Sequence, residues 1–197
     1  MSDKRRNPQP LNPARLEELA LAYVARFATT QGKLRLYLQR KLRERGWDEG
    51  GVPAVEELVG RYAELGYVDD AAWARMKAGS LLRRGYGARR VGEALGQAGV
   101  DEDVCRETRP DRGEQRQAAL VLARRRRFGP FSVHAPESHD DPQRRDDPGG
   151  RDDSKVRDRQ LSAMLRAGHP LDIARRIVES DDAGALEEWA ESGFGDD

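Results

Sequence analysis

The spacing of apolar residues constrains the fold of this chain more than any other feature of its sequence. Wherever the chain carries an ordered pattern, apolar residues recur at steps of three and four, which places them on one face of a helix. No segment alternates apolar and polar residues in the manner of a half-buried strand. The sequence therefore predicts an all-α protein, with helical stripes at 11–27, 34–42, 55–65, 71–82, 91–98, 114–127 and 161–178.

Residues at the ends of these stripes predict where the helices start and stop. Either Thr29 or Thr30 can cap the second helix, because a hydroxyl at that position accepts a hydrogen bond from the first turn. Glycine readily adopts the left-handed conformation in which many helices end. Helix ends or breaks are therefore predicted at Gly46, Gly66, Gly85, Gly87 and Gly99.

Three segments resemble one another and indicate an internal repeat. They are LQRKLRERGWDEG from Leu38, VGEALGQAGVDED from Val91 and LSAMLRAGHPLD from Leu161. Each has an apolar residue, another one four positions later, and then a glycine and a turn. Short helical units that stack on their neighbours form extended arrays with little core per residue. We expect three tandem three-helix repeats, at residues 11–66, 67–110 and 111–180, in an elongated, curved helical array.

Composition predicts that parts of the chain do not fold. Only 37% of the residues are hydrophobic while 36% are charged, so little of the chain can form a thick core. Residues 1–10 are predicted to be a disordered basic arm. Residues 129–155 have almost no aliphatic side chains and are predicted to be a disordered insert within the third repeat. Residues 181–197 form an acidic C-terminal tail, in which Leu186, Trp189 and Phe194 either fold back or fray.

Charge is distributed unevenly along the chain. The 35 basic residues equal the 35 acidic ones, but residues 179–197 contain eight acidic residues and no Lys or Arg, so residues 1–178 carry a net charge of +8. A basic body is compatible with a partner that is a nucleic acid or an acidic protein surface. The single cysteine, Cys105, excludes an intrachain disulfide, and no apolar run approaches the roughly 20 residues of a membrane span. We expect a soluble, cytoplasmic protein without a membrane segment.

The sequence lacks the motifs of common enzymes. It contains no phosphate-binding G-x-x-x-x-G-K-[ST], no H-E-x-x-H and no G-x-S-x-G. His134 and His139 lie in the insert, His169 lies in a predicted turn, and Cys105 has no second cysteine for a zinc site. We therefore expect no catalytic residue, no metal and no cofactor.

The tetrapeptide YVDD, residues 67–70, requires a choice between catalysis and capping. Reverse transcriptases use a similar sequence to present two metal-binding carboxylates, but they place it on a β-hairpin, whereas helices precede and follow it here. An aspartate at a helix start accepts a hydrogen bond from a free backbone N–H and favours the positive end of the helix dipole. The pattern predicts that Asp70, or Asp69 if the helix starts one residue earlier, caps the fourth helix.

Arginine clusters are the other candidate for function. One cluster, Arg40, Lys41, Arg43 and Arg45, lies on the second predicted helix. One interpretation is that the basic side chains of these clusters only face solvent. The other is that the clusters together form a discontinuous positive strip that binds an anion or an acidic protein. We favour the strip, with partner-binding residues at Arg83, Arg84, Arg89, Arg90, Arg124, Arg125, Arg126 and Arg127.

The middle of the chain resembles the RecX family of regulators of the RecA recombinase. That resemblance covers about residues 14–128 and 156–180, and RAGHPLDIARRIV from Arg166 is similar to the end of the family's third unit. Two departures are the insert and the lack of an acidic residue three positions after Thr30, where Lys33 stands. The residues that match the family's central signature are Leu65, Gly66, Tyr67, Val68, Asp69, Asp70, Trp73 and Ala74, followed by Gly85, Gly87, Leu95 and Gly99.

What the resemblance implies is a monomeric, non-enzymatic regulator of DNA repair that lies in the groove of the RecA–DNA filament. Binding there would inhibit the ATPase, strand-exchange and coprotease activities of RecA. Two alternatives stay open at the level of sequence. One is a helical-repeat protein that binds single- or double-stranded DNA directly, and the other is a purely structural helical scaffold.

Overall fold

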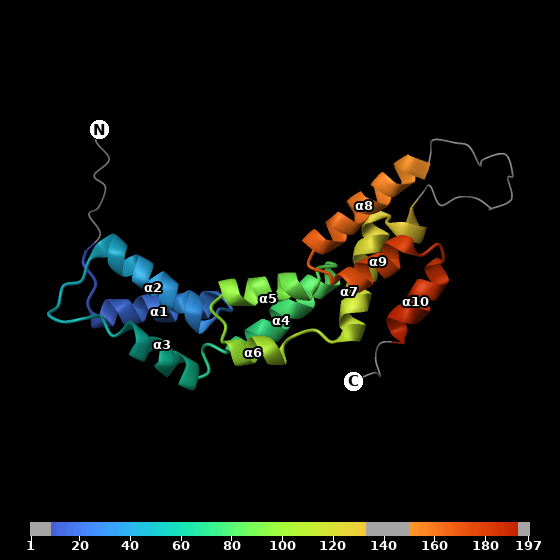
Figure 1. The fold of residues 1–197 in the computed structure, drawn as a ribbon. Helices are drawn as coiled ribbons and strands as arrows, with labels where there is room; N and C mark the ends of the chain where they lie inside the picture. Colours follow the sequence, from blue (N-terminus) through green and yellow to red (C-terminus); the bar gives the residue numbers. More distant parts are fainter. Residues whose placement is uncertain (1–8, 133–149, 193–197) are drawn as a thin grey trace, which may run out of the picture. The chain divides into compact units, whose positions relative to one another are not determined.

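The computed structural model describes residues 9–132 and 150–192, and this part of the chain is all-α as predicted (Figure 1). Its only β-type contact is an isolated bridge between Leu11 and Trp47, so the described residues contain no strand. The helices are α1 Pro13–Arg26, α2 Gln31–Arg45, α3 Val55–Glu64, α4 Asp70–Arg83, α5 Ala88–Gln97, α6 Glu102–Glu107, α7 Arg112–Arg126, α8 Gly150–Arg166, α9 Leu171–Glu179 and α10 Ala183–Glu191, with a 3-10 turn, η1, at Gly129–Phe131.

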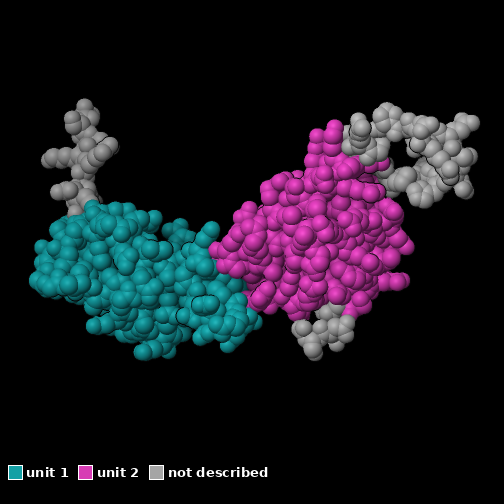
Figure 2. All heavy atoms as spheres, viewed as in Figure 1, with its two compact units in different colours: residues 1–75, 95–107 teal, residues 76–94, 108–197 magenta. Residues whose placement is uncertain are grey.

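Contacts divide the chain into two compact units (Figure 2). Among the described residues, unit 1 comprises 9–75 and 95–107, and unit 2 comprises 76–94 and 108–192. Helix α4 starts in unit 1 and ends in unit 2, whereas α5 starts in unit 2 and ends in unit 1. The division into three repeats stays a prediction.

The core of unit 1 lies between α1, α2 and α3. Leu11 is fully buried in front of α1, where its N–H donates to the carbonyl of Gly46 and its own carbonyl accepts from the N–H of Asp48. These two hydrogen bonds tie the residue two positions before α1 to the end of α2. The buried residues of this core are Leu11, Leu16, Ala20, Leu34, Leu38, Val55, Leu58, Val59, Tyr62 and Val68, most of which the apolar stripes had identified.

A second core lies in unit 2, where α7, α8, α9 and α10 pack together. Ala118, Ala119, Leu120 and Leu122 of α7 are all buried, as the stripe in that segment predicts. Of the two alternatives for the acidic tail, the described part folds back. Leu186 and Ala190 of α10 are buried in the core, whereas Phe194 lies outside the described residues.

The predicted limits of the disordered insert were too wide. Phe131 of η1 packs against the core of unit 2, and the N–H of Gly129 donates to the side chain of Gln160 at 3.0 Å. Helix α8 already begins at Gly150. Residues 153–159 are exposed, so this part of the helix carries no apolar stripe that the sequence could reveal. Residues 133–149 of the insert, and 1–8 of the basic arm, lie outside the described residues.

Candidate partner-binding surface

The two aspartates of YVDD perform different structural tasks at the start of α4. The carboxylate of Asp69 accepts a hydrogen bond from the N–H of Ala72 at 2.8 Å, and the carbonyl of Asp69 accepts from the N–H of Trp73. Asp69 is therefore the N-cap of α4, which confirms the second of the two predicted positions. Asp70 instead accepts a hydrogen bond at 2.8 Å from the N–H of Gln31, the first residue of α2. The Asp70 carboxylate thus accepts a hydrogen bond from the first backbone N–H of α2, a different helix.

Neither aspartate has the surroundings of a metal ligand. Burial raises the pKa of the Asp70 carboxyl, while the hydrogen bond from Gln31 opposes this effect. Within residues 9–132 and 150–192, no group of three His, Cys, Asp or Glu side chains could hold a metal ion. The capping interpretation is therefore the one that the structure supports.

The other residues of the central signature pack around this helix start. Gly66 ends α3 with a φ of 73°, and the N–H of Tyr67 then donates to the carbonyl of Tyr62. Val68 and Ala74 are buried. Tyr67 is 55% exposed and its ring contacts the ring of Tyr62 edge-on. Of the neighbours Tyr67 and Val68, only Val68 belongs to the buried core. Trp73 is also buried, and its ring lies 4.1 Å from the ammonium of Lys33.

The start of α2 meets the end of α5 within unit 1. The hydroxyl of Thr30 donates to the carbonyl of Ala98 and also accepts from the N–H of Lys33, which makes Thr30 the N-cap of α2. A methyl group built on Gly32 would lie 2.7 Å from the α-carbon of Gly99, closer than real side chains allow. Glycine at both positions lets the two backbones touch.

Within unit 2, the start of α5 meets the end of α8 in the same way. The N–H of Gly87 donates to the carbonyl of Ala167 at 2.9 Å, and the N–H of Arg89 donates to that of Gly168 at 3.2 Å. The ring of His169 is buried and donates from Nε2 to the carbonyl of Gly85 at 3.0 Å. Burial lowers the pKa of His169, although the Gly85 contact opposes this.

These two junctions give the internal repeat a structural meaning. In each, the N-terminus of one helix, which carries free N–H groups and a partial positive charge, faces the C-terminal carbonyls of another helix. The turn that accepts the hydrogen bonds is Ala98–Gly99 in one junction and Ala167–Gly168 in the other. These two turns are the Ala-Gly pairs of the second and third repeat segments in the sequence. Two glycines of the signature, Gly87 and Gly99, are therefore needed for close backbone approach.

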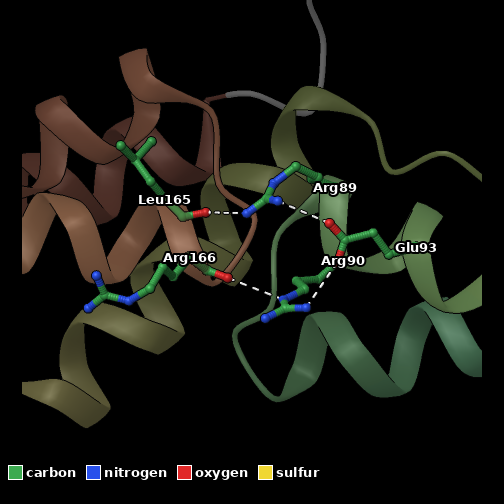
Figure 3. A network of polar contacts seen from close by, with 5 residues as sticks. All are labelled: Arg89, Arg90, Glu93, Leu165 and Arg166. Atoms are coloured by element: carbon green, nitrogen blue, oxygen red, sulfur yellow. Dashed lines mark hydrogen bonds and ion pairs between the residues drawn. The ribbon is translucent and has the colours of Figure 1, made fainter.

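Arg89 and Arg90 were predicted to bind a partner, but both side chains contribute to the junction between α5 and α8 (Figure 3). Arg89 donates to the carbonyl of Leu165 at 2.8 Å, and Arg90 donates to that of Arg166 at 3.2 Å. Both guanidinium groups also pair with Glu93 at 3.0 Å. Because these carbonyls end α8, two positive side chains stabilise its negative end. Both side chains are still half-exposed.

The other predicted arginines lie at the ends of α4 and α7 in unit 2. Arg83 and Arg84 are exposed, and Arg84 lies 5.3 Å from the ring of Tyr86. Arg124 pairs with Glu187 of α10. Arg125, Arg126 and Arg127 are exposed. Arg127 ends α7 in the left-handed conformation with a φ of 58°, and it is the only residue other than glycine with a positive φ among those described.

A second cationic surface, which we call the aromatic–cation surface, includes Arg40 and Lys41 of the basic cluster that the sequence indicated, but sequence reasoning missed the aromatic rings beside them. It lies in unit 1, where aromatic side chains of α1 and α2 stack and basic side chains border them. The signal was present, since aromatic and basic residues occur at helical spacing within both segments. Its residues are Tyr23, Arg26, Phe27, Tyr37, Arg40 and Lys41.

The chain is similar over nearly its whole length to proteins named "Regulatory protein RecX". It is 32% identical to the one from Myxococcus xanthus in an alignment of 186 positions that covers 90% of this chain and 91% of that protein. It is also 32% identical to the one from Mycobacterium sp. (strain JLS), over 94% of each chain. The chain belongs to the RecX family. No protein-family model matches it.

A solved RecX structure supports the fold of this RecX-family chain. The crystal structure of RecX from Lactobacillus salivarius superposes with a TM-score of 0.58 at 15% sequence identity, and the match covers 86% of this chain and 96% of that one. The RecX relatives are named regulatory proteins and not enzymes, in agreement with the absence of enzyme motifs in the sequence. None of the helices in the described part of the chain is long and apolar enough to cross a membrane.

Proposed function

We propose that this RecX-family chain binds the RecA–DNA filament and inhibits the ATPase, strand-exchange and coprotease activities of RecA. The observation that carries the proposal is the similarity to RecX proteins over 90–94% of the chain. The protein acts as a monomer in the cytoplasm, without a cofactor. Its effect on the filament comes from binding one filament state more tightly than another, because a ligand shifts an equilibrium only by its differential affinity.

Exposed arginines of unit 2 make the contact with the filament. Arg83 is the last residue of α4 and Arg84 follows it, while Arg125 and Arg126 lie in the last turn of α7 and Arg127 follows it. All five side chains are exposed. A guanidinium binds carboxylates and phosphates through paired N–H donors, so acidic protein and DNA backbone are both suitable partners. One exposed ion pair contributes only about 0.5 kcal/mol, so several arginines must act together to change affinity tenfold.

The test reverses these charges without disturbing the fold. The variant R83E/R84E/R125E/R126E leaves Arg124 in place, because that side chain pairs with Glu187. A matched control, R157E/R159E, reverses exposed arginines of α8 in the same unit. We expect the first variant to bind a preformed RecA filament at least tenfold more weakly at unchanged melting temperature, and the control to bind like the wild type. Equal binding by both variants would refute the assignment.

Direct DNA binding by the same arginines is the alternative that the sequence left open, and salt dependence separates it from filament binding. Each phosphate contact on a single strand contributes about 0.7 to the slope of log affinity against log salt. If the four reversals reduced affinity for bare DNA as much as for the filament, and removed about 2.8 from both slopes, the arginines would contact DNA. We expect the loss for the filament to exceed the loss for bare DNA.

A further inference from the structure

The aromatic–cation surface of unit 1 has the construction of a stacking platform. The rings of Tyr23 in α1 and Tyr37 in α2 stack at a centroid distance of 4.2 Å and an angle of 15°. Phe27, directly after α1, extends this stack, with its ring 5.4 Å from that of Tyr23 and tilted by 52°. Three aromatic rings from two helices thus form one continuous aromatic surface.

Basic side chains lie over these rings. The guanidinium of Arg26 lies 5.7 Å from the centre of the Phe27 ring. The guanidinium of Arg40 and the ammonium of Lys41 lie 5.7 and 5.9 Å from the centre of the Tyr37 ring. Glu44 pairs with Lys41 at 2.6 Å and lies 3.7 Å from Arg40. Three cations and one carboxylate leave this surface with a net positive charge, so its complement is an anion.

Packing alone accounts for only part of this surface. Tyr23 and Tyr37 pack against the core of unit 1, so their stack also seals the contact between α1 and α2. Phe27 is different, because it is 51% exposed and lies outside that core cluster. A half-exposed ring between a core-packed aromatic stack and a guanidinium offers an apolar face next to a positive charge. That combination suits a ligand that is planar and anionic.

We infer that the aromatic–cation surface binds single-stranded nucleic acid. A base stacks on Phe27, and the adjoining phosphates contact Arg26, Arg40 and Lys41. Only an unpaired strand can present the face of a base to a protein ring, whereas a duplex keeps its bases stacked inside. An acidic protein would match the charge but would leave the aromatic ring without a stacking partner. This site is separate from the arginines of unit 2 and requires no contact with RecA.

The test measures binding of the full chain to a labelled oligothymidylate by fluorescence anisotropy, without RecA. An oligonucleotide of about 16 residues covers the range of site sizes known for single-strand-binding domains. The variant F27L keeps the apolar volume but removes the ring, and we expect roughly tenfold weaker binding. The variant R26Q/R40Q removes two phosphate contacts, so the slope against log salt falls by about 1.4.

Matched controls exist within unit 1. Y67L removes another half-exposed ring, one that contacts Tyr62 and lies at the end of α3. R61Q/R106Q removes the same charge as R26Q/R40Q from side chains that pair with Glu17 and Asp103. Both controls are expected to bind the oligonucleotide like the wild type.

Three results would overturn the inference. The first is that the wild-type chain does not bind the oligonucleotide, and the second is that it binds a duplex of equal length more tightly. The third is that F27L and R26Q/R40Q bind the oligonucleotide normally but no longer inhibit RecA, which would make this surface a protein-binding one. A chain that binds single strands through Phe27 yet leaves RecA unaffected would confirm the inference while contradicting the proposed function.

Discussion

Replacing Gly87 by alanine tests the junction between α5 and α8 most directly. The backbone of Gly87 has no positive φ, so alanine meets a spatial obstacle and not a conformational one. A methyl group at this position would lie 2.3 Å from the carbonyl oxygen of Gly168 and 2.5 Å from the backbone nitrogen of His169, whereas ordinary contacts begin near 3.4 Å. Both neighbours are backbone atoms, so no flexible side chain can move aside.

The expected loss of stability follows from the contacts that break when the backbones at Gly87 and Gly168 move apart. Moving the two backbones apart by about 1 Å breaks the hydrogen bonds from the N–H groups of Gly87 and Arg89, each of which contributes about 1 kcal/mol. Overpacking at a tight contact adds about 1–3 kcal/mol. We expect Gly87→Ala to lower the free energy of unfolding by about 3–5 kcal/mol, a large share of the stability of a small domain.

Urea denaturation followed by circular dichroism measures this loss, and hydrogen exchange of the Gly87 and Arg89 amides shows where it occurs. Gly92, in the helix α5 that follows Gly87, is the matched control, because a methyl group there meets no atom within 4 Å. Gly92→Ala should instead stabilise the chain by about 0.5–1 kcal/mol through helix propensity. If Gly87→Ala were as stable as the wild type or as Gly92→Ala, the described junction would be wrong.

Further predictions concern the helix starts and His169. Asp69→Ala should lower the free energy of unfolding by about 1 kcal/mol by removing the cap of α4, measured by thermal melting. Asp70→Ala should cost a similar amount through the N–H of Gln31, whereas Asp70→Asn, which keeps an acceptor, should cost less; equal losses would exclude that hydrogen bond. Burial lowers the pKa of His169, so below about pH 6.5 the unfolded chain binds a proton that the folded chain does not. Stability should therefore fall as the pH drops from 7 toward 5, by at most about 1.4 kcal/mol per pH unit, and His169→Gln should remove this part of the slope. An identical slope in that variant would contradict the assignment.

Apolar periodicity predicted the helices well because most of them bury one face. Stripes through α1, α2 and α7 matched the buried residues, and Thr30, Gly46 and Gly66 lie at helix boundaries. The stripe failed where a helix buries little. The first described turns of α8 are exposed, and the short helix α6, Glu102–Glu107, has no buried residue at all. Such segments look like loops to any method that depends on burial.

Contacts between distant residues could not be predicted from the sequence. Asp70 was expected to cap its own helix, but its partner Gln31 lies 39 positions earlier. Arg89 and Arg90 looked like surface charges, and their carbonyl partners lie 76 positions later. In both cases the local pattern identified the correct chemistry, an acceptor or a donor at a helix end, while the fold determined which helix it serves. The remaining arginines stay predicted contacts.

The most direct test of the proposed function is the rate of ATP hydrolysis by RecA on single-stranded DNA, titrated with this chain. We expect the rate to fall with increasing protein to a low plateau, and R83E/R84E/R125E/R126E to need at least tenfold more protein for the same effect. An ATPase rate that stays constant at saturating protein would contradict the account, as would full inhibition by the charge-reversed variant at wild-type concentrations.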